Sequence, residues 1–273
     1  MGLALSGFAA NSLLCRLALA GNQHIDAVTF TAIRILSGAL MLTVLAGPRR
    51  ALGHGSAGSA LALLGYAVAF SLAYVRIGAA AGALLLFGAV QLTMLVGAFV
   101  RGEQLGGRTL LGLAIALGGL AWLVAPGVGA PSPLGGALMA AAGASWGVYS
   151  LLGRAAGDAL AATAGNFVRA ALPAAALLAA ALLRHEVSIT AAGAGLAVGS
   201  GTIASGLCYA AWYAALPQLR AARAGVIQLL VPVFAALAAV PLLGEPLSLR
   251  LLSAGGIVIG GVALVILGPQ RES

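Results

Sequence analysis

The sequence is a succession of apolar runs, each roughly 20 residues long, separated by short breaks that hold most of its charged residues. When such a run forms an α-helix, its length matches the hydrocarbon core of a bilayer, which is about 30 Å thick. A helix also satisfies the backbone hydrogen bonds within the run, which lipid cannot do. The pattern therefore predicts an all-α integral membrane protein with ten transmembrane helices. The ten runs are residues 2–20, 27–46, 58–76, 78–99, 109–126, 134–154, 160–183, 190–215, 221–243 and 247–267.

The composition excludes a water-soluble fold. Hydrophobic residues make up 62% of the chain and charged residues only 7%, which is too little polar surface to cover a soluble globule of this size. A secretory signal would need a basic segment before a short apolar core, whereas Met1 leads directly into an apolar run. We therefore interpret that run as the first membrane span and expect no separate soluble domain.

The charges indicate an orientation in the membrane and not a nucleic-acid site. The net charge of +8 comes from arginine alone, and the largest basic cluster is the pair Arg49 and Arg50. With the N-terminus in the cytoplasm, eight loop arginines lie on the inner side and three on the outer side. This asymmetry satisfies the positive-inside rule. It predicts a multi-pass protein of the cytoplasmic (inner) membrane with both termini in the cytoplasm.

Two similar sequence segments occur about half the chain apart, RGEQLGGR around Glu103 and GEPLSLR around Glu245. The likeness extends along both halves, and Arg34 in the second run has Arg169 as its counterpart in the seventh. Each half holds five runs, an odd number, so the second half must enter the membrane in the opposite orientation. We expect two inverted five-helix repeats, 1–126 and 134–268, with a short tail at 269–273. Such repeats build secondary transporters whose substrate site lies near the middle of the membrane.

The run AGVIQLLVPVFAALAAVPLLGEPLSLRLLSAGGIVIGGVALVIL, together with FTAIRILSGAL near the start, resembles the EamA family of the drug/metabolite transporter superfamily. The most specific part is the spacing of Pro232, the pair Gly244 and Glu245, and the pair Gly260 and Gly261. The resemblance covers essentially the whole chain. It implies a carrier for a small organic solute, and family substrates include amino acids, metabolites and drugs.

Aromatic and polar side chains inside the runs are the candidates for substrate contact. Tyr66, Phe70 and Tyr74 recur every four residues and so share one helix face. Rings of this kind can line a cavity and grip an organic solute, or they can be ordinary helix contacts and interfacial belt residues. For Tyr74 and Trp122, near the ends of their runs, packing is the preferred interpretation. The candidate substrate-binding residues are Asn11, Arg34, Tyr66, Phe70, Gln91, Trp146, Tyr149, Arg169, Tyr209 and Tyr213.

The two matched arginines, Arg34 and Arg169, have two possible roles. An arginine inside the bilayer is expensive and usually faces protein or a water-filled cavity, which makes it a functional candidate. It can also be structural, tied to backbone carbonyls near the end of a span, and we prefer this interpretation. The glycines Gly256 and Gly260 have the spacing of a close helix contact, either between spans ten and five or in a dimer.

The sequence offers no constellation for catalysis or for a metal or cofactor. Every acidic residue lies in a loop or at the edge of a run, so a membrane-embedded carboxylate for cation and proton exchange is missing. The three histidines, His24, His54 and His185, are also in loops, and no HExxH or CxxC motif occurs. We therefore expect no enzyme, no metal and no cofactor.

These observations together predict a carrier that works by alternating access. Its expected substrate is an amino acid or a similar neutral or zwitterionic solute, and the family resemblance favours export. The alternatives are an exchanger of sugar-phosphate-type anions, which could pair with Arg34 or Arg169, and a broad-specificity drug exporter. The expected partners are the substrate and the lipid bilayer, without nucleic acid. Proton coupling and the choice between monomer and dimer stay open.

Overall fold

The computed structural model describes residues 2–20, 24–102, 106–125, 131–219, 224, 227–228, 230–244 and 247–266. These residues are helical apart from short connections, and their only β pairing is an isolated antiparallel bridge between Ile25 and Ile189. The helices are α1 (Gly2–Leu19), α2 (Ala27–Ala46), α3 (Pro48–Gly53), α4 (Ala57–Tyr74), α5 (Ala79–Val100), α6 (Gly107–Val124), α7 (Pro133–Gly153), α8 (Ala159–Leu183), α9 (Ala191–Gly199), the π-helix η1 (Ser200–Leu207), α10 (Cys208–Ala215), the 3-10 helix η2 (Leu216–Gln218), α12 (Val231–Leu243) and α13 (Leu249–Ile266).

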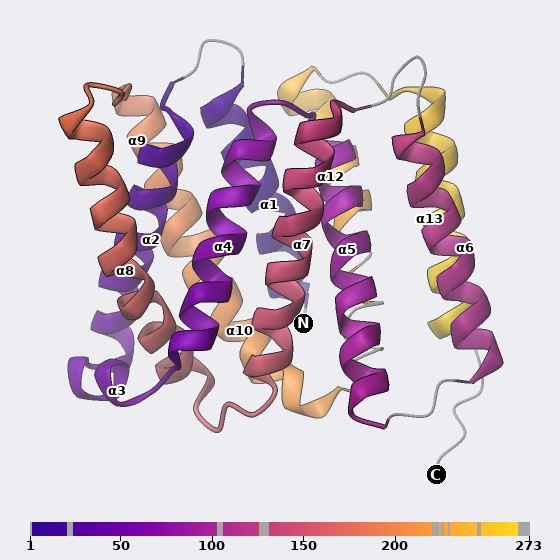
Figure 1. The fold of residues 1–273 in the computed structure, drawn as a ribbon, viewed down its shortest axis with the longest axis horizontal. Helices are drawn as coiled ribbons and strands as arrows, with labels where there is room; N and C mark the ends of the chain where they lie inside the picture. The colour runs from indigo at the N-terminus through magenta and orange to yellow at the C-terminus, as the bar shows by residue number, and fades with distance from the viewer. Residues whose placement is uncertain are drawn as a thin grey trace.

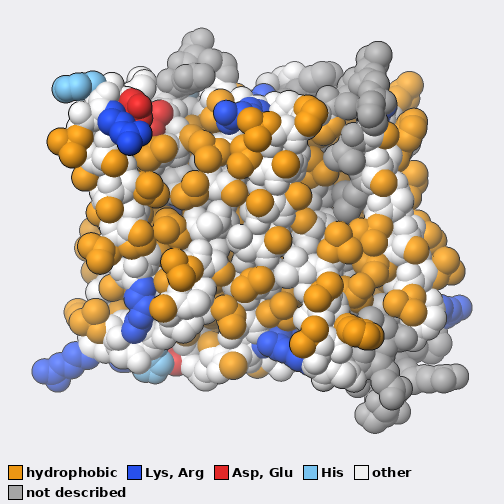
Figure 2. Space-filling view, in the orientation of Figure 1, with side chains coloured by type: hydrophobic (Ala, Val, Ile, Leu, Met, Phe, Trp, Pro, Cys, Tyr) orange, Lys and Arg blue, Asp and Glu red, His pale blue; other side chains and the backbone are white. Residues whose placement is uncertain are grey.

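Six of the described helices are long and apolar enough to cross a membrane: α1, α2, α4, α5, α8 and the continuous helix Ala191–Gln218. The apolar helices Gly107–Leu123, Val231–Leu243 and Leu249–Val265 are shorter. Hydrophobic side chains cover the middle of the face in Figure 2, and most charged side chains lie near its upper and lower edges. The predicted all-α, multi-pass membrane fold is therefore confirmed. The arrangement of ten spans in two repeats goes further than this and stays a prediction.

The breaks between the runs supply the caps that start the helices. Asp26 accepts a hydrogen bond from the backbone N–H of Thr29 at the start of α2, and Asp158 does the same for Ala161 at the start of α8. Such caps satisfy backbone donors that have no partner within the helix. One predicted break is itself helical, because Pro48 occupies a first-turn position where proline is favoured and begins α3.

The helices pack in pairs that join distant parts of the chain (Figure 1). At one edge of the bundle α2 lies along α8, and at the other edge α6 lies along α13. Between these pairs, α7 packs on α4 and α5, while α1 packs on α12 and on the helix formed by α9, η1 and α10. The largest buried cluster of side chains runs through this central group and extends into both edge pairs, for example to Phe167 on α8 and Val258 on α13.

The turn to π-helical winding at η1 occurs where this helix meets α2. Gly201 lies against the backbone carbonyl of Arg34, so that a side chain at this position would collide with α2. The close approach lets Ser200 and Ser205 on η1 point to partners inside the bundle, and both are fully buried. Single π segments within α-helices often accompany functional sites.

The contact between α6 and α13 includes Gly112 and Gly261, each of which lies against the other's backbone carbonyl. Nothing lies within 4 Å of the position that a side chain would take at Gly256 or Gly260. Of the two alternatives for this glycine pair, docking of span ten on span five is therefore wrong, and a contact in a dimer stays a prediction. The helix is rotated so that Gly261, the next residue along, faces α6.

We expect Gly112→Leu to destabilise the protein by about 1–3 kcal/mol, because the new side chain meets the Gly261 carbonyl and the side chain of Val265. The control is Gly118→Leu on the same helix, where the space is open. Both variants gain helix propensity, so their difference isolates the collision. Thermal unfolding of the purified protein in detergent measures the effect. Equal melting temperatures for the two variants would contradict the packing described here.

Candidate functional site

The centre of the candidate site is the guanidinium of Arg34 on α2. Arg34 is only 1% exposed. Its Nε donates to Ser205 Oγ at 2.9 Å, and its Nη2 donates to the hydroxyls of Tyr209 at 2.6 Å and Tyr66 at 3.1 Å. The charged group also lies over the rings of Tyr66 and Phe70, 5.1 and 5.2 Å from their centroids. Hydroxyls and ring faces therefore hold this cation on several sides.

One nitrogen of the guanidinium has no protein partner. Nη1 of Arg34 is buried without a hydrogen bond. The buried polar residues in the described part of the chain include no Asp or Glu, and Arg34 is the only charged residue among them. A buried charge is costly unless it is paired and fully hydrogen-bonded. The site thus presents an unused donor on an uncompensated positive charge.

Tyr66 connects Arg34 to a network that spans the bundle. The Tyr66 hydroxyl accepts from Asn11 Nδ2 at 3.1 Å and from the Tyr209 hydroxyl at 3.0 Å, in addition to Arg34. Asn11 Oδ1 in turn accepts from Ser200 Oγ at 2.6 Å. The network joins α1, α2, α4, η1 and α10, so helices that are far apart in the sequence position the same hydroxyl.

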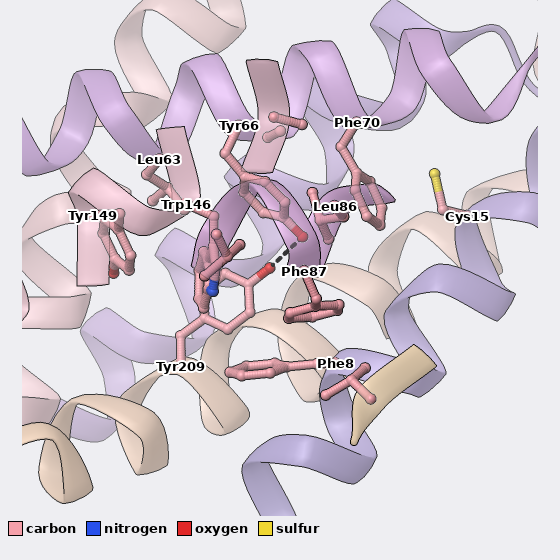
Figure 3. Close-up of a cluster of buried hydrophobic side chains, with 14 of the residues drawn as sticks. Phe8, Cys15, Leu63, Tyr66, Phe70, Leu86, Phe87, Trp146, Tyr149 and Tyr209 are labelled. Atoms are coloured by element: carbon pink, nitrogen blue, oxygen red, sulfur yellow. Dashed lines mark hydrogen bonds between the residues drawn. The ribbon is translucent and has the colours of Figure 1, made fainter. Parts of the chain in front are cut away.

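Aromatic rings close the site on the side of Tyr66 and Tyr209 (Figure 3). The Trp146 ring is 5.1 Å from that of Tyr66 and 4.4 Å from that of Tyr209, and Phe8 packs edge-on against Trp146 at 5.2 Å. The rings enclose a cavity of about 10 Å³, which is about the room that one water molecule needs. The cavity is lined by Phe8, Tyr66, Leu86, Phe87, Trp146 and Tyr209. The site is closed, with no space for an organic solute.

Further hydrogen-bonded side chains adjoin the aromatic rings through Trp146 and Tyr149. The Tyr149 ring lies 5.2 Å from that of Trp146, and its backbone carbonyl accepts from the Tyr213 hydroxyl at 3.0 Å. The Trp146 indole N–H donates to Gln228 Oε1 at 2.7 Å. These bonds fix the orientation of Trp146, so the indole offers the cavity its apolar surface and not its N–H.

The structure brings most of the predicted site residues into one connected group and leaves two outside it. Gln91 is buried on α5, and its Oε1 has no hydrogen-bond partner. Arg169 is exposed on α8, where its guanidinium donates to the backbone carbonyls of His54, Gly165 and Leu52. The connected residues are Asn11, Arg34, Tyr66, Phe70, Trp146, Tyr149, Tyr209 and Tyr213.

Arg34 and Arg169 correspond in sequence but differ in surroundings. Arg34 faces η1 and the tyrosines, whereas Arg169 faces α3 and the turn that follows it. The preferred interpretation, a structural arginine tied to backbone carbonyls, describes the bonds of Arg169 but not those of Arg34, whose partners are side-chain hydroxyls. The site also includes Ser200 and Ser205, which the sequence analysis did not assign to it. They are five residues apart, which an α-helix would spread over different faces and the i to i+5 winding of a π-helix brings together.

Comparison with known proteins gives consistent matches. The sequence pattern of the EamA-like transporter family matches residues 133–267. An uncharacterised protein of Pseudomonas aeruginosa is 54% identical over 268 residues, which cover 97% of this chain and 92% of that protein. A crystal structure of another protein superposes with a TM-score of 0.71 at 23% identity, covering 97% of this chain and 96% of that one. At this identity the superposition supports the fold alone.

We expect Ser205→Ala to lower the free energy of unfolding by about 1–3 kcal/mol, because it leaves the buried Nε of Arg34 without its acceptor. Thr202→Ala is the matched control. Its hydroxyl lies on the same π-helix and bonds only to the Val198 carbonyl of its own helix, so we expect a change within about 0.5 kcal/mol. Thermal or denaturant unfolding in detergent compares the two. A loss as large in the control would mean that the π-helix and not Arg34 accounts for the effect.

Proposed function

Because the chain belongs to the EamA-like transporter family, we propose that it is a secondary transporter that moves a small organic metabolite across the cytoplasmic membrane by alternating access. The proposed substrate is an amino acid or a similar neutral or zwitterionic solute, and the proposed direction is export. One observation carries this proposal. The Arg34 network and the aromatic cage, which consists of the rings of Tyr66, Trp146 and Tyr209, lie inside the helix bundle, and helices from both halves of the chain contribute to them. Central sites between two halves are typical of secondary transporters.

The pairing of the helices supports the inverted repeat. If the two halves are exchanged helix for helix, the pairs α2 with α8, α5 with α12 and α6 with α13 are unchanged. The contact of α4 with α7 then becomes the contact of α1 with the helix containing α9 and α10, which also exists. In addition, α5 ends at the lower edge of Figure 1, whereas α12 ends at the upper edge. Equivalent connections at opposite edges are what an inverted repeat requires.

At the upper end of the α2 and α8 pair in Figure 1, Asp26 joins the start of α2 to the connection that follows α8. Besides capping α2, its carboxylate accepts from the backbone N–H of Ser188 at 2.9 Å, in the connection that follows α8. The backbones of Asp26 and Ser188 also bond to each other, and Thr190 N–H donates to the His24 carbonyl at 2.7 Å. The connection after α8 is therefore tied to the start of α2.

The lower end is held by the equivalent residue of the other half. Asp158, the cap of α8, pairs with Arg50 in the connection that follows α2. Hydrogen bonding from the Ala161 backbone and the Arg50 guanidinium lower the pKa of the Asp158 carboxyl, so the pair stays ionised at neutral pH. Both ends of this helix pair are thus fastened at once, which supports an occluded state between the two openings of an alternating-access cycle.

The unpaired Nη1 of Arg34 favours a second candidate function, an exchanger of organic anions. An anion in the site would compensate the buried positive charge, which a neutral solute would not. Counterflow in proteoliposomes, with a panel of amino acids and organic anions, tests both candidates. Exchange of amino acids supports the first, exchange of anions alone supports the second, and the absence of saturable exchange contradicts both.

The inverted repeat predicts opposite locations for the two similar connections. Single cysteines replacing Glu103 or Glu245, which lie outside the described residues, should react from opposite sides of the membrane in a background without Cys15 and Cys208. We expect the cysteine at 103 to react from the cytoplasm and the cysteine at 245 from outside. Labelling of intact cells and inverted vesicles with a membrane-impermeant maleimide gives the measurement. Reaction from the same side would refute the repeat.

If the aromatic cage contacts the substrate, Trp146→Phe should reduce counterflow by about tenfold, because it reshapes the cavity wall and removes the bond to Gln228. Trp122→Phe is the matched control, since Trp122 is 48% exposed on α6 and lies away from the cavity. Melting temperatures of both variants are measured alongside. Equal losses of transport that track losses of stability would indicate packing and not recognition.

A further inference from the structure

We infer that Arg34 receives the carboxylate of a substrate whose body is apolar and carries no second charge. This inference rests on the second candidate function, the exchange of organic anions, and names the substrate class of the same site in place of the zwitterionic solute of the first candidate. Three features of the site carry it: the charge balance around Arg34, the position of the two tyrosine hydroxyls, and the lining of the cavity.

The charge balance calls for one negative charge. Arg34 is the only charged residue among the buried residues that the structure describes, and its protein partners are neutral hydroxyls and rings. Neutral partners reduce the cost of burying the guanidinium without cancelling its charge. A singly charged anion would cancel it. A phosphate monoester with two charges would instead leave one uncompensated negative charge in the same apolar surroundings.

The geometry of the guanidinium suits a carboxylate. Arginine binds carboxylates with two parallel N–H bonds, and Nη1 of Arg34 is already without a partner. Nη2 is occupied by the hydroxyls of Tyr66 and Tyr209, and both tyrosines also line the cavity. The side chains of these two tyrosines therefore connect the cavity to Nη2. A carboxylate that displaces their hydroxyls gains both nitrogens and leaves the hydroxyls free to donate to it.

The remaining walls of the cavity are apolar and select the body of the substrate. Phe8, Leu86 and Phe87 have no polar side-chain atoms, and the indole N–H of Trp146 is taken by Gln228. An aromatic or branched apolar group fits such walls as the rings separate. An ammonium group would find no buried carboxylate among the described residues, so the site does not require one.

The test uses three probes that share a phenyl group and differ in the head: 3-phenylpropanoate, 3-phenylpropanamide and 2-phenylethyl phosphate. Each is added in excess to the purified full-length protein, and the melting temperature is recorded. We expect the acid to raise the melting temperature and the isosteric amide to leave it unchanged, because the amide lacks the charge. The phosphate, with its second charge, should also have no effect. An equal rise with the amide, or no rise with the acid, would overturn the inference.

Variants assign the effect to Arg34. In Arg34→Gln the affinity for 3-phenylpropanoate should fall at least about tenfold, whereas Arg169→Gln, which removes a guanidinium bound to backbone carbonyls, should respond like the parent. Unchanged affinity in Arg34→Gln would overturn the inference. If this variant does not fold, the comparison of acid and amide on the parent protein decides alone.

Counterflow separates a failure of this inference from a failure of the proposed function. Equal exchange of the acid and the amide in proteoliposomes would leave the carrier function standing and refute the carboxylate. Stabilisation by the acid without saturable exchange of any solute would refute the carrier function and support the binding site. Exchange of the acid alone, lost in Arg34→Gln, would support both.

Discussion

The burial of a single guanidinium organises the centre of this bundle. Lipid cannot hydrogen-bond to Arg34, so the protein must supply partners from several helices at once. Ser205 comes from the π-helix, Tyr66 from α4 and Tyr209 from α10, and the hydroxyls of the two tyrosines also bond to each other. The helices that meet here are therefore linked by polar bonds as well as by packing, and a displacement of one helix changes the surroundings of the charge.

Because movement of α2 changes the surroundings of Arg34, the contacts at the two ends of the α2 and α8 pair matter for the proposed cycle. Asp26 ties the start of α2 to the connection after α8, and Asp158 ties the start of α8 to the connection after α2. Arg34 lies between these two fastenings on α2. In the proposed cycle, release of one end would let the pair separate there while the other end stays closed.

The sequence was sufficient for the helical fold and for much of the candidate site, because both follow from local patterns. The lengths of the apolar runs predicted the helices, and four-residue spacing placed Tyr66 and Phe70 on one face. What it missed depends on how helices rotate against one another. The sequence correspondence of Arg34 and Arg169 in the predicted repeat did not give Arg169 the surroundings of Arg34, and the glycine spacing pointed to Gly260 where Gly261 makes the contact. The rotation of a helix about its own axis depends on the helix that it packs against, and a local sequence pattern holds no information about that partner.

The π-helix has a consequence for motion. Eight residues, Ser200–Leu207, are wound more widely than the α-helical segments on either side. If this stretch rewound as an α-helix while α9 stayed in place, α10 would rotate about the helix axis. Tyr209 lies just beyond the stretch and would be carried around the axis relative to Arg34. A change of winding in Ser200–Leu207 would therefore move Tyr209 relative to the guanidinium of Arg34 without a tilt of the whole helix.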